Sequence, residues 1–193
     1  MEDKISNSIH TYSSWEDTKD PAACNTNPSV YKKFTRDPER TPFQWDGSSN
    51  AGFSTADKTW LPVNPNYVDL NLKAEKVADK SHFKFYQRLM KLRNLDTFKF
   101  GDLKVQALSR FVFAYVRELL DNNTYVVVIN LGPDDEHVDL KIFASLKDKL
   151  KVVAASPTSS YEEGWVQRWA FLVVTNVFWF ACLINAWNLQ LCH

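Results

Sequence analysis

Two arginines four residues apart carry side chains that could bind negatively charged or polar groups. Arg36 and Arg40 lie in segment 35–40, where acidic side chains separate them. A guanidinium carries a rigid fork of donors that can hold a carboxylate and vicinal hydroxyl groups together. Arg36 also has a purely structural interpretation, which is a salt bridge with Asp37 or Glu39.

The charge balance and the cysteine and histidine patterns exclude several classes of function. Lys plus Arg equals Asp plus Glu at 23 each, so the chain lacks the basic excess typical of nucleic-acid binders. The 3 cysteines are odd in number, and neither they nor the 4 histidines have metal-ligand spacing. We therefore expect no cofactor, no metal and no nucleic-acid partner.

The elements that must position the arginines are irregular before they become regular. Residues 1–34 and 35–70 follow neither a helical nor a strand period, and such a segment keeps one conformation only against a larger body. Residues 80–94 predict a helix with Ser81 as its N-cap. Its apolar stripe contains Phe83, Tyr86, Leu89 and Met90, and Leu92 could extend it.

Beyond a predicted linker at Thr97–Asp102, the period of the apolar residues changes to two. Turn-forming residues separate short β-branched runs, and one run is apolar throughout, as in a strand buried on both faces. This pattern predicts a small antiparallel sheet or sandwich. The expected strands are Leu103–Leu108, Phe111–Arg117, Thr124–Leu131, His137–Ile142 and Leu150–Ala155.

Several motifs, taken in order along the chain, resemble the α-glucosidases of glycoside hydrolase family thirteen. Residues 1–25 are similar to the segment that precedes these motifs in insect maltases, and the resemblance covers roughly residues 1–156. The motifs are Arg36-Asp37, Arg40-Thr41-Pro42-Phe43-Gln44-Trp45-Asp46, Asn50-Ala51-Gly52-Phe53, Trp60-Leu61-Pro62-Val63-Asn64-Pro65-Asn66-Tyr67 and Phe85-Tyr86-Gln87-Arg88-Leu89-Met90.

The resemblance implies an α+β chain with two architectural parts and a divergent end. Residues 1–97 would be the last loop and helix of a (β/α)8 barrel, whose active site lies at the C-terminal ends of the strands. Residues 102–156 would form a truncated antiparallel β-domain. Residues 157–193 would be a divergent apolar tail.

The resemblance also implies which chemistry to expect from the complete enzyme. Retaining family members use an Asp nucleophile, a Glu acid/base and a further Asp, all upstream of the segment matched here. None of the acidic residues of this chain lies in those motifs, so we expect the isolated chain to be inactive. The acidic residues considered are Glu2, Asp3, Glu16, Asp17, Asp20, Asp37, Glu39 and Asp46.

Substrate contacts follow from the matched loop. The resemblance implies that Arg40 binds the terminal glucose of an α-glucoside such as maltose, sucrose or a maltooligosaccharide, with Arg36 as the second candidate. The residues expected to hold the loop rather than the sugar are Phe43, Gln44, Trp45 and Asp46. An alternative is a non-catalytic scaffold like the amino-acid-transporter heavy chains, which tend to lose the sugar-binding arginine of this loop.

The apolar run at 169–187 leaves three interpretations open. It is long enough for a membrane helix or a lipid-anchor signal, it could be an aberrant translation, or it could pack as strands. Residues 1–15 are not a signal peptide, although the parent enzyme is expected to be secreted or membrane-anchored outside the cell. Asn122 begins a glycosylation sequon in an expected turn.

Overall fold

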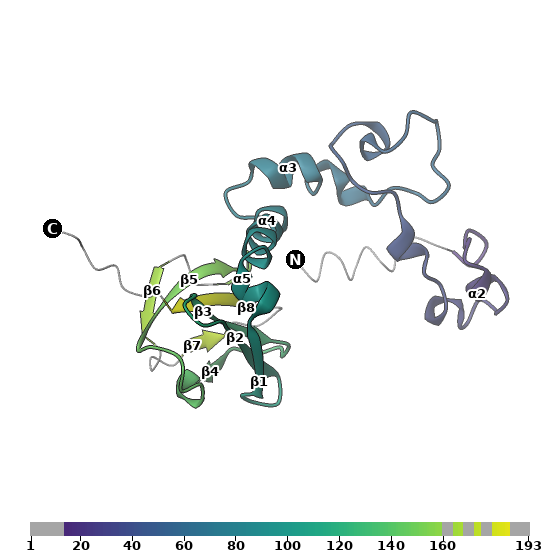
Figure 1. Cartoon of the computed structure of the whole chain (residues 1–193). Helices are drawn as coiled ribbons and strands as arrows, with labels where there is room; N and C mark the ends of the chain where they lie inside the picture. Colours follow the sequence, from purple (N-terminus) through teal and green to yellow (C-terminus); the bar gives the residue numbers. More distant parts are fainter. Residues whose placement is uncertain (1–13, 160–163, 168–171, 175–178, 186–193) are drawn as a thin grey trace. The chain divides into compact units, whose positions relative to one another are not determined.

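The computed structural model describes residues 14–159, 164–167, 172–174 and 179–185. The chain forms two compact units, Met1–Asp79 and Lys80–His193, and each is described by itself (Figure 1).

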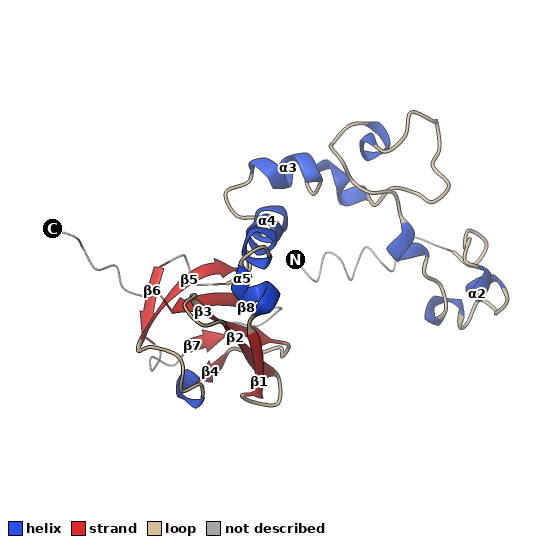
Figure 2. Ribbon diagram, in the orientation of Figure 1, coloured by secondary structure: helices blue, strands red, loops and turns tan. Residues whose placement is uncertain are grey.

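The described part of the first unit contains short helices and loops and no strand (Figure 2). This confirms the irregular character expected for residues 35–70, although Leu72–Val77 form a short helix, α3, that periodicity did not indicate. Asn71 caps α3 by accepting a hydrogen bond from the Ala74 N–H at 2.9 Å. The other short elements are α2 (Pro21–Cys24) and the 3-10 turns η1 (Tyr31–Lys33), η2 (Asp37–Arg40), η3 (Ser49–Gly52) and η4 (Pro65–Val68).

A tight loop of left-handed residues organises the middle of the first unit. Asn50, Ala51 and Gly52 have φ values of 51°, 56° and 66°, and the Ala51 carbonyl accepts hydrogen bonds from the N–H groups of Trp45 and Asp46. A Cβ on Gly52 would come within 2.8 Å of an Asp46 carboxylate oxygen. The left-handed φ and the nearby Asp46 carboxylate both favour glycine at position 52, although Ala51 adopts a similar φ.

The second unit begins with the predicted helix, α4 (His82–Arg93). Ser81 is its N-cap, as expected, because the Ser81 hydroxyl accepts a hydrogen bond from the Lys84 N–H at 3.2 Å. The linker expected at Thr97–Asp102 is wrong over most of its length, since α5 (Asp96–Phe100) occupies it. Long-range packing fixes this helix: Thr97 is buried and donates to the Asn123 carbonyl at 2.9 Å.

The sheet of the second unit has the strand order β1-β2-β3-β8-β5-β6, and its neighbours pair antiparallel. Four of the expected strands are confirmed within one residue at each end. The fifth, His137–Ile142, is only partly correct, because β4 (Glu136–Val138) gives way to a 3-10 turn, η5 (Leu140–Ile142). The remaining bounds are β1 (Asp102–Ala107), β2 (Val112–Glu118), β3 (Thr124–Asn130), β5 (Lys149–Ala155), β6 (Gly164–Gln167), β7 (Leu172–Val174) and β8 (Trp179–Asn185).

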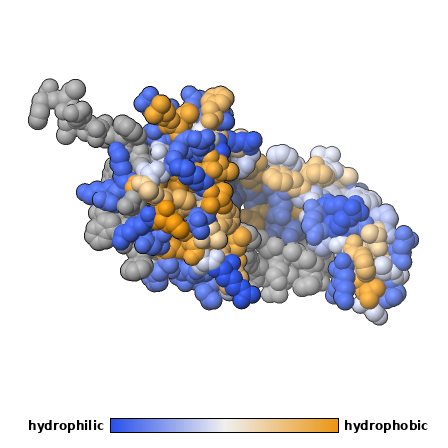
Figure 3. Space-filling view, turned by 60° about the horizontal axis from the view of Figure 1, so that its bottom comes forward, coloured by the Kyte–Doolittle hydropathy of each residue, from blue (hydrophilic) through white to orange (hydrophobic). Residues whose placement is uncertain are grey.

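The core of the second unit lies on both faces of the sheet. Residues 125–128 of β3 are all buried, which confirms the expectation for this continuously apolar run. One face packs Val112, Val126 and Leu150 against residues that follow β4. Figure 3 shows that the surface of this sheet-containing body mixes hydrophobic and hydrophilic residues.

On the other face of the sheet, α4 contacts Tyr125, Val127 and Ala154 through a stripe that overlaps the expected one. The helix residues in contact are Phe85, Leu89 and Leu92. Tyr86 is instead 60% exposed. The expected stripe contains Leu89 and could extend to Leu92, but it leaves out Phe85, because apolar residues at three- and four-residue steps define more than one face.

The described residues of the apolar tail form strands. The central position of β8, between β3 and β5, means that residues 179–185 complete the sheet. Of the three interpretations of residues 169–187, the described backbone follows the strand interpretation. Within residues 14–159 and the three short described stretches beyond them, no helix is both long and apolar enough to span a bilayer.

Candidate functional site

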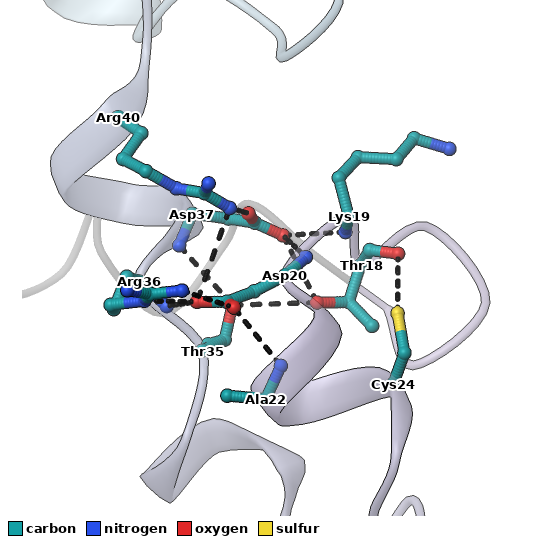
Figure 4. A network of polar contacts seen from close by, with 9 residues as sticks. All are labelled: Thr18, Lys19, Asp20, Ala22, Cys24, Thr35, Arg36, Asp37 and Arg40. Carbon is teal, nitrogen blue, oxygen red and sulfur yellow. Dashed lines mark hydrogen bonds and ion pairs between the residues drawn. The ribbon is translucent and has the colours of Figure 1, made fainter.

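Two loop segments of the first unit bring an arginine pair and an aspartate pair together (Figure 4). One is the entry to α2, which supplies Asp20, and the other is the η2 turn with Arg36 at its N-cap. Asp37 begins this turn and Arg40 ends it. Both carboxylates are buried, at 0% and 4% exposed, whereas both arginine side chains reach solvent.

Asp20 binds Arg36 through both the backbone and the side chain of the arginine. One carboxylate oxygen accepts from the Arg36 backbone N–H at 2.7 Å and from its Nε at 2.8 Å. The other oxygen accepts from Arg36 Nη2 at 2.9 Å and from the Ala22 N–H at 3.1 Å. This two-pronged contact is the geometry in which an arginine and a carboxylate bind most strongly.

Asp37 also links the two segments, but here the carboxylate belongs to the η2 turn and most of its donors belong to the segment that contains Asp20. Its Oδ2 accepts from the Lys19 N–H at 2.7 Å and from the Thr18 hydroxyl at 3.0 Å, and its Oδ1 accepts from Arg40 Nη2 at 2.6 Å. Arg40 Nη2 also lies 3.9 Å from Asp20 Oδ2. The two aspartates and two arginines therefore form one continuous ionic cluster.

Arg40 is the member of the cluster that contacts an aromatic ring. Its guanidinium carbon lies 5.4 Å from the ring centroid of Trp60, which is a cation–π contact. Trp60 and Asp37 both line a pocket of about 220 Å³ with Lys19, Thr41 and Leu61. The Arg40 side chain is 36% exposed and that of Arg36 is 65% exposed, so both guanidinium groups are accessible from solvent.

The cluster keeps both carboxyl groups ionised. Hydrogen bonds from Arg36 hold the pKa of Asp20 well below its ordinary value, despite burial. Burial alone would raise the pKa of Asp37, but hydrogen bonds from the Lys19 N–H, Arg40 and Thr18 outweigh it and lower that pKa. The partner of Asp20 responds accordingly, and the pKa of Arg36 is raised.

The structure brings both predicted arginines together but changes the partner of one. Arg36 pairs with Asp20 rather than with Asp37 or Glu39, as its structural interpretation had supposed. Sequence reasoning did not predict Asp20 and Trp60 as partners of the two arginines. Asp20 lies 16 positions before Arg36, so short-range charge spacing could not identify it.

The residues expected to hold the loop make loop contacts. The Gln44 side-chain amide donates to the Leu70 carbonyl and to Asn66 Oδ1. Asp46 accepts from the Ser48 N–H at 2.8 Å. Phe43 and Trp45 stack edge to face, with ring centroids 4.7 Å apart.

The sequon lies apart from this cluster, in the second unit. Asn122 is in the turn between β2 and β3, where its side chain donates to the Leu120 carbonyl at 3.0 Å. Its glycosylation stays a prediction. Across the described ranges, no group of three or more His, Cys, Asp and Glu side chains is arranged to hold a metal ion.

Comparisons with known proteins agree with the motifs of the arginine loop. The alpha-amylase catalytic-domain family matches residues 3–101. Maltase 1 of Drosophila virilis is 45% identical over 148 residues, which cover 77% of this chain and 23% of the maltase. A salivary alpha-glucosidase of Anopheles gambiae is 36% identical over 161 residues, or 82% of this chain and 27% of that protein.

A solved structure is also similar. A mutant isomaltulose synthase of Erwinia rhapontici, crystallised with D-glucose, has a TM-score of 0.70 and 25% identity, and the likeness covers 91% of this chain and 33% of that one. The chain thus spans about a quarter of the length of the two relatives and a third of this structure. Because the family match covers about half of its residues, the chain belongs to the alpha-amylase family. Within that family it is similar to the maltase-type α-glucosidases.

Proposed function

We propose that this chain is the part of a retaining α-glucosidase that supplies Arg40 to the subsite for the terminal glucose. In this proposal residues 1–97 correspond to the last loop and helix of a (β/α)8 barrel. Residues 102–156 correspond to the antiparallel β-domain, and residues 157–193 follow it as a divergent segment. The substrates of the complete enzyme are α-glucosides such as maltose, sucrose and maltooligosaccharides.

The observation that carries the proposal is the way Arg40 is held. Asp37 takes the Nη2 group at 2.6 Å and Trp60 covers the guanidinium at 5.4 Å, beside a pocket that both residues line. The remaining edge of the donor fork is oriented before any ligand arrives. A pre-oriented fork suits the adjacent hydroxyl groups of a sugar, because less side-chain freedom is lost on binding.

The two buried aspartates do not provide the hydrolytic chemistry. Retaining hydrolysis needs one carboxyl group that is protonated as an acid and a second that attacks as a nucleophile. Asp20 and Asp37 are both engaged by arginines, and the pKa of each is lowered rather than raised. We therefore infer that turnover belongs to the complete enzyme, and that the 193-residue chain does not hydrolyse α-glucosides on its own.

The relatives also support an extracellular setting for the complete enzyme. The salivary α-glucosidase is by its name a protein of a secretory tissue. In that setting Asn122 would be a glycan acceptor, since it lies in a turn of the second unit. Similarity to named glucosidases and the presence of Arg40 favour this function over that of a transporter-type scaffold.

A chimera tests the proposal. Residues 14–156 of this chain replace the matching segment of Drosophila virilis maltase 1, and hydrolysis of maltose is measured. We expect the chimera to be active and Arg40→Ala to lower its kcat/KM by about a hundredfold or more, since hydrogen bonds from a charged donor are lost. Arg110→Ala, an exposed arginine of the second unit, is the matched control and should leave kcat/KM unchanged.

Two results would contradict the proposal. An active chimera in which Arg40→Ala and Arg110→Ala behave alike would remove Arg40 from the subsite. Turnover of maltose by the purified 193-residue chain, above that of a mock preparation, would show that the missing carboxylates are not needed.

A further inference from the structure

Asp20 is the point at which both loop segments and both arginines of the site converge. Its side chain is completely buried, and its carboxylate oxygens accept hydrogen bonds from the Arg36 N–H, Arg36 Nε, Arg36 Nη2 and the Ala22 N–H. The second arginine lies 3.9 Å from Asp20 Oδ2. A buried carboxylate is costly unless it is fully hydrogen-bonded, so this arrangement must be maintained by its partners.

Capping of α2 does not explain this arrangement. The cap uses one hydrogen bond, to the Ala22 N–H, and α2 has only 4 residues. The other three hydrogen bonds all go to Arg36. They fix its backbone as well as its guanidinium, and Arg36 is the N-cap residue of the turn that ends at Arg40.

We propose that Asp20 is a positioning residue for Arg40, acting through Arg36. Asp20 anchors the start of the η2 turn, Asp37 then receives Arg40 Nη2, and Trp60 covers the guanidinium. Arg36 serves the geometry of the loop in this scheme, and Arg40 alone contacts the glucoside. The assignment of a sugar to Arg40 rests on the proposed function, whereas the mechanical link from Asp20 to Arg40 does not.

The ring of Trp60 makes this link measurable in the 193-residue chain. Protons of Arg40 that lie over the indole experience its ring current, so their NMR chemical shifts report the contact directly. The exchange rate of the Arg40 Nε–H with water reports how firmly the side chain is held. Both signals are compared in the wild type, in Asp20→Asn and in Asp57→Asn, which changes an exposed aspartate of the same unit.

We expect Asp20→Asn to abolish the ring-current shift of Arg40 and to speed exchange of its Nε–H by about tenfold, because a charge-assisted anchor is lost. Asp57→Asn should match the wild type. Arg36→Met is the second variant, since it breaks the same side-chain link but leaves Asp20 to cap α2. It should displace Arg40 in the same way.

The outcomes separate the two proposals. If either variant keeps a folded first unit, by its Trp45 and Ala51 amide shifts, and Arg40 keeps its wild-type shift and exchange rate, the positioning role is refuted. If both variants unfold the first unit, Asp20 has a general stabilising role and the specific assignment is likewise refuted. A maltose titration of the wild type tests only the proposed function. If maltose does not bind, the Arg40 signals in the variants still decide whether Asp20 positions Arg40.

Discussion

Different interactions stabilise the inside of each of the two units. Among the described residues, the buried hydrophobic side chains of the first unit are Ala23, Tyr31, Ala51 and Leu61, and the other fourteen lie in the second unit. The first unit instead buries Asp20 and Asp37 in an ionic cluster.

The first unit therefore depends mainly on hydrogen bonds and ion pairs for a fixed conformation, and the second unit mainly on apolar burial. Apolar burial is non-directional, so a small shift of one side chain in the sheet core costs little stability. Removing a whole buried side chain costs much more, because it leaves a cavity. A network of hydrogen bonds is directional, and each partner depends on the others. We therefore expect the loop that carries the arginine cluster to open more easily than the sheet of the second unit.

The largest expected contrast is in hydrogen exchange. Amides of β3, whose residues 125–128 are buried, should exchange about a thousandfold more slowly than those of the η2 turn, because opening them requires unfolding of the sheet. Exchange measured by mass spectrometry on peptides from each unit checks this. Equal protection in both units would contradict the comparison.

A cavity in the second unit should give the next largest effect. Leu150 is fully buried in the core of the sheet, and Leu150→Ala should lower the free energy of unfolding by about 2–5 kcal/mol. Denaturant unfolding followed by circular dichroism measures this, with the 85% exposed Leu120→Ala as control. A loss below that of the control would show that the sheet core is not closely packed.

Backbone strain should make two glycines of the first unit respond differently to replacement by alanine. Gly52→Ala should destabilise this unit by about 1–3 kcal/mol, because its φ of +66° is left-handed and its Cβ would meet Asp46. Gly47→Ala is the matched control, since its Cβ would lie at an ordinary 3.5 Å from the Val68 carbonyl. Proteolysis of the first unit reports the change, and equal cleavage of the two variants would refute the conformational argument.

Acid should have the smallest effect on stability, and it should destabilise the first unit more than the second. The pKa values of Asp20 and Asp37 are lowered, so their stabilising contribution is complete above the ordinary aspartate pKa of about 4. It is lost as the pH falls from there through the lowered folded-state values. NMR amide shifts of residues 18–40 should stay constant from neutral pH to about pH 5 and change below about pH 4. Titration near neutral pH would contradict the lowered values.

The sequence predicted local features well and long-range pairings poorly. A period of two with turn residues between the runs located β1, β2, β3 and β5, and Ser81 located the start of α4. The contact face of α4 was predicted only in part: Leu89 was expected to contact the core, but Phe85 belongs to a neighbouring stripe whose role depends on the sheet.

The site shows the same limit. The motif identified Arg36 and Arg40 as a pair, but it did not reveal their contacts with Asp20 and Trp60, which are 16 and 20 positions away from Arg36 and Arg40, respectively. Likewise, an apolar run gives no sign that residues 179–185 pair with β3 and β5. Such pairings follow from the folded topology rather than from local composition.

The most direct test of the central claim is an NMR titration of the 193-residue chain with maltose. We expect saturable shifts of the Arg40 Nε–H and the Trp60 indole N–H, no shifts in the sheet, and loss of the response in Arg40→Ala. An unchanged Arg40 signal at saturating maltose, or an equal response of Trp60 in Arg40→Ala, would contradict the claim.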